Sequence, residues 1–300
     1  MATIRNVVLA GVSGNLGPAI LRAVSSAAFK VTVFTRPGSS PPVTPGVETV
    51  EVDYESVDDL ATKLKGKDAV VSTIPPTAAA AQTNLIQATL LAGVPRFLPS
   101  EFGSDLHNAL NRAAPAYKAK VETQGLLESL AAEGKLSYTI VYTGAFLDWG
   151  LRAGFPINPV KKVAALHDGG DRLYTTTTLE TVGKAVVGVL NHPEETKNRV
   201  VRIGEINTTL KEVLALSQEI VGSNGWTITE PDTTEAVEKA LAQIKQGIFS
   251  QETILPFIYK AVWGEGNGGY FEQTDNELLG IRELDKSSLK QIIQRVVDHQ

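Results

Sequence analysis

Three glycines near the start of the chain have the spacing of a phosphate-binding loop. Gly11, Gly14 and Gly17 lie in the sequence VVLAGVSGNLG, after an apolar run and before a helix-forming segment. In such a strand–turn–helix unit the first glycine lets the chain turn, the second lets the backbone approach a pyrophosphate, and the third lets the helix pack on the strand. The spacing predicts a dinucleotide-binding loop; the alternative is an ordinary turn with glycines for packing. The expected contacts are Gly11, Ser13, Gly14, Asn15, Leu16 and Gly17.

Arg36 indicates which dinucleotide the loop would bind. It ends a second apolar run, residues 31–35, about twenty residues beyond the glycines. An NAD-binding protein usually carries an acidic side chain at the end of this strand. A guanidinium instead pairs with a phosphate through two parallel hydrogen bonds, and Ser39 and Ser40 can add donors. We therefore predict NADP(H) as the cofactor; the alternative is a solvated arginine at a strand end.

Polar and aromatic residues follow two later strands, at the sheet edge where ligands bind. The first strand, residues 69–73, runs into the diproline Pro75-Pro76, which would either lie along the cofactor or act as a stiff connector. The second, residues 96–99, is followed by Ser-Glu-Phe-Gly-Ser-Asp. From these segments we expect further cofactor contacts from Ser72, Thr73, Ile74, Ser100 and Phe102.

A lysine is the remaining candidate for proton transfer. The Tyr-x-x-x-Lys pair of short-chain dehydrogenases is absent, because none of the seven tyrosines has a lysine four residues later. Lys118 lies near the start of an amphipathic segment. A lysine serves as a base when burial or neighbouring charges let it lose its proton readily, as in a cleft beside a nicotinamide. We therefore expect Lys118 to be the catalytic group and to contact the cofactor.

The elements that must position these residues alternate along the first half of the chain. Short apolar runs separated by helical segments require crossover connections, and crossovers give a parallel sheet whose strands are buried on both faces. The predicted strands are residues 4–9, 30–35, 47–52, 69–73, 96–99 and 137–141, and the predicted helices are residues 15–26, 57–64, 79–92 and 115–132.

The pattern changes after about residue 150. Residues 154–172 have no clear period, Thr178 is typical of an N-cap for a helix over 180–190, and a strand follows at 199–203. Thr209 would cap a helix through residue 221, and the remainder is helical, broken at Pro256 and over 264–269. We predict a doubly wound parallel sheet over residues 1–153 and a smaller α+β substrate-binding region over 154–300.

Composition excludes several classes of protein. The 300 residues carry a net charge of −5, which gives no basic footprint for nucleic acid. There is no cysteine, which excludes disulfides, thiolate metal sites and a cysteine nucleophile. The four histidines are scattered, so we expect no metal. No signal peptide and no apolar run of ~20 residues is visible. We therefore expect a cytoplasmic protein that binds no membrane. We expect it to be a monomer or a homodimer.

Four of these segments together resemble a known family. GVSGNLG, Arg36, RFLPSEFGSD and YKAKV are similar to the isoflavone reductase-like, or NmrA-like, atypical short-chain reductases. WGEGNGGYFEQTDNELLG and other stretches of the second half resemble its fungal, CipA-type branch. The resemblance implies a Rossmann-type sheet, NADPH, and a catalytic lysine in a K-x-x-[VI] element. Lys118 to Val121 matches that element, and Lys120 is the competing lysine.

At a few positions near the expected substrate pocket, the residues of this chain differ from those of the family's plant members. Glu122 and Thr123 stand where those members carry two arginines, and an asparagine near Gly144 is missing, so isoflavones and lignans are doubtful substrates. Phe102, Phe146 and Trp149 would contact the substrate.

The resemblance implies an NADPH-dependent reductase of a small aromatic, phenylpropanoid-like or enone-type metabolite. Lys118 would either deprotonate a phenol or, as an ammonium, stabilise or protonate an oxyanion. The alternative function is an NADP(H)-binding redox sensor of the NmrA type, which regulates a partner without catalysis.

Overall fold

A seven-stranded parallel sheet forms the centre of the molecule, in the order β11-β6-β5-β4-β1-β2-β3. The computed structural model describes residues 3–39 and 44–299. Neighbouring strands are parallel throughout this sheet, and the strand order reverses between β1 and β4. This is the Rossmann-type doubly wound sheet predicted from the sequence. Its strands are β1 (Asn6–Ala10), β2 (Lys30–Thr35), β3 (Glu48–Glu51), β4 (Ala69–Ser72), β5 (Arg96–Leu98), β6 (Ser137–Tyr142) and β11 (Arg199–Arg202).

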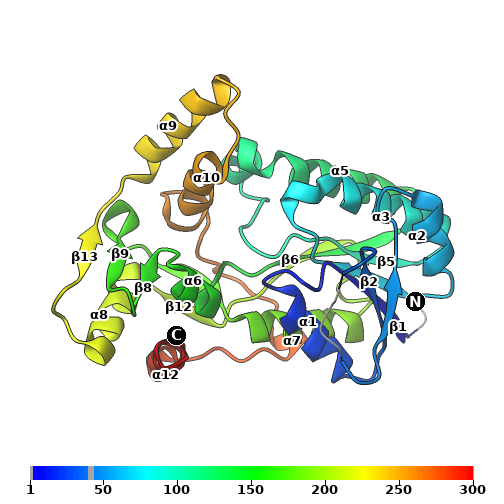
Figure 1. Cartoon of the computed structure of the whole chain (residues 1–300), viewed down its shortest axis with the longest axis horizontal. Coiled ribbons are helices and arrows are strands. Elements are labelled where there is room, and N and C mark those ends of the chain that lie inside the picture. Colours follow the sequence, from blue (N-terminus) through cyan, green and yellow to red (C-terminus); the bar gives the residue numbers. More distant parts are fainter. Residues whose placement is uncertain (1–2, 40–43, 300) are drawn as a thin grey trace.

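Helices cover both faces of the sheet (Figure 1). One face carries α1 (Gly17–Ser25) and α7 (Leu179–Asn191), and the other carries α2 (Val57–Leu64), α3 (Ala79–Leu91) and α5 (Lys118–Ala132). On β1, Val7 and Leu9 pack into the first core, whereas Val8 and Ala10 pack into the second. Because both faces are buried, the strand reads as an unbroken apolar run.

A smaller α+β region builds up beside the sheet. It holds two three-stranded sheets, β12-β10-β7 and β13-β9-β8. Their strands have only two to four residues, which is too short for a periodic pattern in the sequence. The strands are β7 (Ala145–Phe146), β8 (Ile157–Asn158), β9 (Val163–Ala165), β10 (Tyr174–Thr177), β12 (Ile206–Thr208) and β13 (Thr227–Thr229). The helices are α6 (Leu147–Ala153), α8 (Leu210–Val221), α9 (Thr233–Lys245), α10 (Gln251–Trp263), α11 (Asn276–Leu279) and α12 (Lys286–Asp298).

The central sheet takes elements from both halves of the chain. β11 and α7 lie beyond residue 153, yet β11 pairs with β6 and α7 packs in the core beside α1. Arg96 of β5, which is 1% exposed, donates to the Thr139 hydroxyl at 2.7 Å and to the Thr196 carbonyl at 3.3 Å. The central sheet therefore contains strands from both sides of residue 153. The division into residues 1–153 and 154–300 stays a prediction.

Two predicted helix starts are confirmed and one predicted break is wrong. Thr178 and Thr209 are the N-caps of α7 and α8, and each accepts a backbone hydrogen bond from three residues on. The helix does not break at Pro256, which lies inside α10. At this position proline removes one hydrogen bond, to the exposed Glu252, and the capping box of Ser250 and Thr253 secures the helix start. None of the helices in the described ranges is long and apolar enough to span a membrane.

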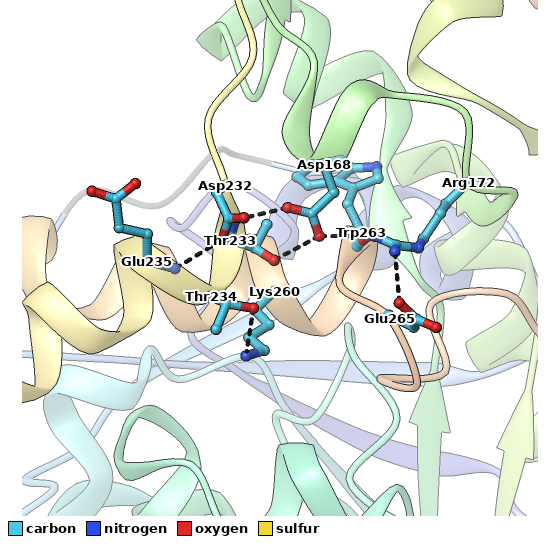
Figure 2. A network of polar contacts seen from close by, with 9 residues as sticks. All are labelled: Asp168, Arg172, Asp232, Thr233, Thr234, Glu235, Lys260, Trp263 and Glu265. Atoms are coloured by element: carbon cyan, nitrogen blue, oxygen red, sulfur yellow. Dashed lines mark hydrogen bonds and ion pairs between the residues drawn. The ribbon is translucent and has the colours of Figure 1, made fainter.

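Helices α9 and α10 form a hairpin in which α9 projects from the body of the molecule, while the end of α10 is buried in it (Figure 1). A polar network ties its base to the rest of the fold (Figure 2). The Asp168 carboxylate accepts from the Thr233 amide at 2.7 Å, from the Thr233 hydroxyl at 2.8 Å and from Arg172 at 2.8 Å. Arg172 also donates to the Trp263 carbonyl and to Glu265. The network therefore fixes the start of α9 to the end of α10.

Candidate active site

A cavity of about 840 Å³ lies at the carboxyl ends of β1, β2, β4 and β5, where the strand order reverses. This is the edge at which an open parallel sheet binds ligands. Many of the residues predicted from the sequence line it: Gly11, Ser13, Gly14, Asn15, Leu16, Arg36, Thr73, Ile74, Ser100, Phe102, Phe146 and Trp149. Further lining residues include Phe34, Thr35, Ser39, Tyr54, Pro75, Pro76, Ala78, Ala81 and Lys120.

The three glycines of the loop serve different purposes. Gly11 has a φ of +87°, and a Cβ there would lie 2.7 Å from the Thr73 carbonyl carbon. A Cβ on Gly17 would lie 2.5 Å from Val12 Cα, so Gly17 packs the helix against the loop and does not line the cavity. Gly14 is different, because its Cβ would meet only the Gly11 carbonyl oxygen, at 3.6 Å. A Cβ at position 14 would therefore meet no close contact, and a glycine there leaves the space above the loop open for a ligand to approach.

The start of α1 faces the same cavity without a cap of its own. Leu16 is the N-cap residue and lines the cavity, but no side chain accepts a hydrogen bond from the first turn. The first turn also carries no acidic residue, and Pro18 stands at its beginning. The partial positive charge of the helix start is thus left for an anion in the cavity.

Arg36 lines the same cavity as the glycine loop and is exposed. Among the described residues, no carboxylate forms a salt bridge with it, and Ser39 lines the cavity beside it, whereas Ser40 lies outside those residues. Tyr54 donates to the Phe34 carbonyl at 3.2 Å. Burial raises the pKa of Tyr54, and the Arg36 charge opposes that rise. Tyr54 was not predicted as a lining residue, because it lies in the loop after β3, outside every motif.

The turn after β4 forms a rigid wall of the cavity. Thr73 donates from its hydroxyl to the Ala10 carbonyl at 2.9 Å, which joins the turn to β1. Ser72 is fully buried, and its hydroxyl accepts from the Ile74 amide at 3.4 Å. Ser72 therefore supports the turn and does not line the cavity, unlike the contact expected from the sequence. Pro75 and Pro76 continue the wall.

The structure brings Lys120, and not Lys118, to the cavity. Lys118 is the first residue of α5; its side chain is 80% exposed and its ammonium lies 3.9 Å from the exposed Glu122 carboxylate. Lys120 is half-buried and lines the cavity with Ser100 and Phe102. Two residues along a helix correspond to a rotation of about 200°, so only one of the two lysines can face the cofactor edge.

Beneath Lys120 lies a buried polar cluster of Glu101, Gln124, Arg112 and Tyr142. Glu101 and Gln124 are both 0% exposed. Gln124 donates to Glu101 at 3.0 Å and to the Tyr142 hydroxyl at 3.1 Å, and accepts from Arg112 at 3.1 Å. Burial raises the pKa of Glu101, and the Lys120 charge is the largest effect that opposes this rise. The sequence motif contained Glu101, but nothing in it assigned the residue a role.

Three aromatic side chains form the remaining wall. Phe102 is 8% exposed, while Phe146 and Trp149 are half-buried where α6 begins. The Trp149 ring lies 6.1 Å from Phe155, centre to centre, and this contact leads to the aromatic cluster of the second half. His107 is exposed, stands edge-on to Tyr142 at 6.1 Å and does not line this cavity.

A second cavity, of about 790 Å³, shares no lining residue with the first. It lies between the segment 110–115, ahead of α5, and the α9–α10 hairpin. The Asp168 and Arg172 pair of Figure 2 and the apolar side chains of Val237, Leu241 and Phe257 line it. Gly11, Gly14, Arg36 and Lys120 all line the first cavity, which is therefore the candidate active site.

Known proteins share both the sequence and the architecture. The sequence profile of the NmrA-like family matches residues 4–225. The chain is 32% identical over 289 residues to oxidoreductase aprR of Aspergillus flavus, covering 93% of this chain and 96% of that protein. It is 29% identical over 303 residues to oxidoreductase poxI of Penicillium oxalicum, covering 95% and 91%. The solved NADPH complex of leucoanthocyanidin reductase from Vitis vinifera has a TM-score of 0.75 at 18% identity, covering 96% of this chain and 99% of that one.

Proposed function

Because this chain belongs to the NmrA-like family, we propose that it is an NADPH-dependent reductase of a small aromatic, phenylpropanoid-like or enone-type metabolite. One observation carries the proposal: a single cavity is lined by the glycine loop, by an arginine with no ion pair among the described residues, by a lysine and by an aromatic wall. The fungal relatives are named oxidoreductases, and the leucoanthocyanidin reductase was solved as a complex with NADPH. These names support the class of reaction and leave the substrate to be found.

The residues of the first cavity suit NADPH. Gly14 and the uncapped start of α1 would hold the pyrophosphate, and Arg36 would pair with the 2′-phosphate. The wall of Thr73, Ile74 and the diproline would hold the cofactor against Phe102. When bound, the nicotinamide supplies a hydride. Phe146 and Trp149 would cover the substrate and exclude water from it.

Lys120 is our proposed proton-transfer group, in place of the Lys118 expected from the sequence. Its half-buried side chain lines the cavity, whereas the Lys118 ammonium points to solvent beside Glu122. A positioned acid or base must reach the reacting atom directly or through one water molecule, so geometry favours Lys120.

A pair of alanine variants tests the assignment, because each lysine is the control for the other. Lys120→Ala should lower kcat ~10²–10⁴-fold with little change in NADPH affinity, and Lys118→Ala should have a small effect. Oxidation of NADPH by a panel of aromatic enones, quinones and benzylic ethers supplies the assay. Loss of activity in Lys118→Ala alone would restore the motif-based assignment. NADPH binding that alters affinity for a protein partner, without turnover of any compound, would favour the redox sensor.

A further inference from the structure

The second cavity, of about 790 Å³, has the size and the mixed lining of a small-molecule site. The apolar side chains that line it include Val237 and Leu241 of α9 and Phe257 of α10. The polar ones include Lys260 of α10 and Asn267 of the loop that follows this helix. Because the two cavities share no lining residue, a ligand in the second one leaves the proposed NADPH site free.

Lys260 is a cation of this cavity that has no anionic partner. Among the residues that the structure describes, no carboxylate forms an ion pair with it, and its ammonium donates only to the Thr234 hydroxyl, at 3.3 Å. Figure 2 shows this ammonium turned away from the labelled carboxylates. An ammonium has three hydrogens to donate, so Lys260 keeps donors for a ligand.

The three carboxylates that line the cavity bind other groups. Asp168 and Glu265 both accept from Arg172, at 2.8 and 3.2 Å. Asp232 is the N-cap of α9 and accepts from the Glu235 amide at 2.8 Å, where the positive end of the helix dipole offsets its charge. Of the charged groups that line this cavity, the Lys260 ammonium is therefore the one that can attract an anion.

Asn267 offers the cavity a buried acceptor that receives no donor. The residue is 4% exposed, and its side-chain oxygen has no hydrogen-bond partner among the described residues. Asn111 fixes the orientation of this amide. It donates to the carbonyls of Asp105 and Asn267, at 2.9 and 2.8 Å, so its own oxygen must accept from the Asn267 amide nitrogen, at 2.7 Å. A buried acceptor left unpaired costs free energy, which a hydroxyl of a ligand can offset.

These two groups lie close together at the end of α10. A Cβ on Gly264, the C-cap residue, would lie 2.7 Å from Lys260 Cγ and 3.1 Å from the Asn267 side-chain oxygen. Both atoms therefore border the same small space, and the Lys260 ammonium lies three bonds beyond Cγ. One small molecule can thus donate to Asn267 and accept from Lys260.

We propose that the second cavity is a separate ligand site, for a small aromatic acid that carries a hydroxyl group. The carboxylate accepts charge-assisted hydrogen bonds from Lys260, and the hydroxyl donates to the Asn267 oxygen. The ring packs on the apolar side chains of α9 and on Phe257. The proposal goes beyond the reductase function and does not depend on it, because every residue it uses lies outside the first cavity.

Isothermal titration calorimetry of the full chain at neutral pH, without NADPH, tests the class of ligand. The probes are 4-hydroxybenzoate and 4-hydroxycinnamate, which differ in length, and at least one should bind with a Kd below ~1 mM. Its methyl ester should bind about 10–100-fold more weakly, because the ester has no charge for Lys260. The acid without the hydroxyl should bind about 2–10-fold more weakly, because it leaves Asn267 unpaired. Failure of both acids to bind, or equal affinities of acid and ester, overturns the proposal.

Substitution of Lys260 locates the bound acid. Lys260→Met removes the ammonium and keeps an unbranched side chain, so this variant should bind the acid only as weakly as it binds the ester. The matched control is Lys239→Met on α9. Lys239 is 73% exposed, pairs with Glu235 and does not line the cavity, so its loss should leave the affinity unchanged. Equal affinities of the parent and Lys260→Met for the acid contradict the proposed contact.

Changes in the first cavity separate this site from the proposed NADPH site. Lys120→Ala and Gly14→Val should bind the acid as the parent does, because both residues line only the first cavity. Saturating NADPH should not displace the acid from the parent. Loss of the acid in Lys120→Ala, or its displacement by NADPH, places it in the first cavity and overturns the proposal. Because these titrations need no turnover, they decide the second site whether or not a substrate for the reductase is found.

Discussion

Arg36 has no carboxylate partner among the described residues, and this should determine the choice of cofactor. We expect the protein to bind NADPH more tightly than NADH. Arg36→Asp should weaken NADPH binding roughly 10–100-fold, since hydrogen bonds to charged groups contribute ~1.5–3 kcal/mol. Fluorescence titration with both cofactors measures the change. Arg22→Asp makes the same charge change on α1, away from the cavity, and should leave both affinities intact. Equal affinities of the parent for NADPH and NADH would contradict the assignment.

The difference between Gly14 and Gly17 gives a second prediction at this scale. Gly14→Val should fold with a Tm near that of the parent and lose NADPH binding, because only the ligand needs the space above it. Gly17→Ala should lower the Tm, because its Cβ would lie 2.5 Å from Val12 Cα. Circular dichroism and NADPH titration of both variants check this. A folded Gly14→Val protein with normal NADPH affinity would mean that the phosphate loop lies elsewhere.

The hairpin of α9 and α10 depends on Asp168, which anchors it from outside (Figure 2). Asp168 has a φ of 49°, a conformation that asparagine tolerates, so Asp168→Asn removes the charge with little backbone strain. We expect faster amide exchange in α9 and a loss of ~1–3 kcal/mol from the free energy of unfolding. Hydrogen-exchange mass spectrometry locates the effect.

A matched control for that anchor is Glu265→Gln. The Glu265 side chain is 89% exposed, and its ion pair with Arg172 should contribute little. If the two variants exchange α9 amides at the same rate, the half-buried Asp168 carboxylate is not the anchor.

Long elements could be read from the sequence, and short ones could not. Continuous apolar runs such as VVLA and AVVS, separated by helices of eight or more residues, predicted the parallel sheet within one or two residues of its strand ends. The strands of the second half have two to four residues and no period. The break predicted at Pro256 is wrong because a well-capped helix tolerates proline where the lost carbonyl partner is exposed.

The sequence predicted the loop residues that line the candidate site, but it did not predict which lysine of α5 lines it. Backbone turns are encoded locally, so Gly11, Gly14 and Arg36 could be found from their spacing. The lysine depends on the rotation of α5, which follows the short 3₁₀ turn of Pro115–Tyr117. Sequence gives no measure of that rotation, and the K-x-x-V motif favoured Lys118 over Lys120. Tyr54 and Glu101 acquire their positions only through tertiary packing.

The whole molecule is built from interleaved halves, which yields a prediction about fragments. A fragment of residues 1–153 would lack β11 and α7, so β6 would lose one of its two neighbouring strands and the core beside α1 would lose its cover. We expect this fragment to unfold without a cooperative transition, and a fragment of residues 1–204 to regain one in part. Thermal unfolding followed by near-ultraviolet circular dichroism makes the comparison. A cooperative transition in 1–153 equal to that of the full chain would show an independent domain.

The late position of β11 also matters during synthesis on the ribosome. Every residue of β6 is buried in the finished protein, but its outer hydrogen-bonding edge stays open until residues 199–202 have emerged. The intervening chain must first be made, and it includes Phe146 and Trp149, which line the cavity. For that interval the nascent protein presents an apolar strand edge, which is the kind of surface that chaperones bind and that pairs wrongly with other chains. Arg96 can donate to the Thr196 carbonyl only at the end of this interval. This hydrogen bond of the buried arginine therefore forms only when β11 is about to pair with β6.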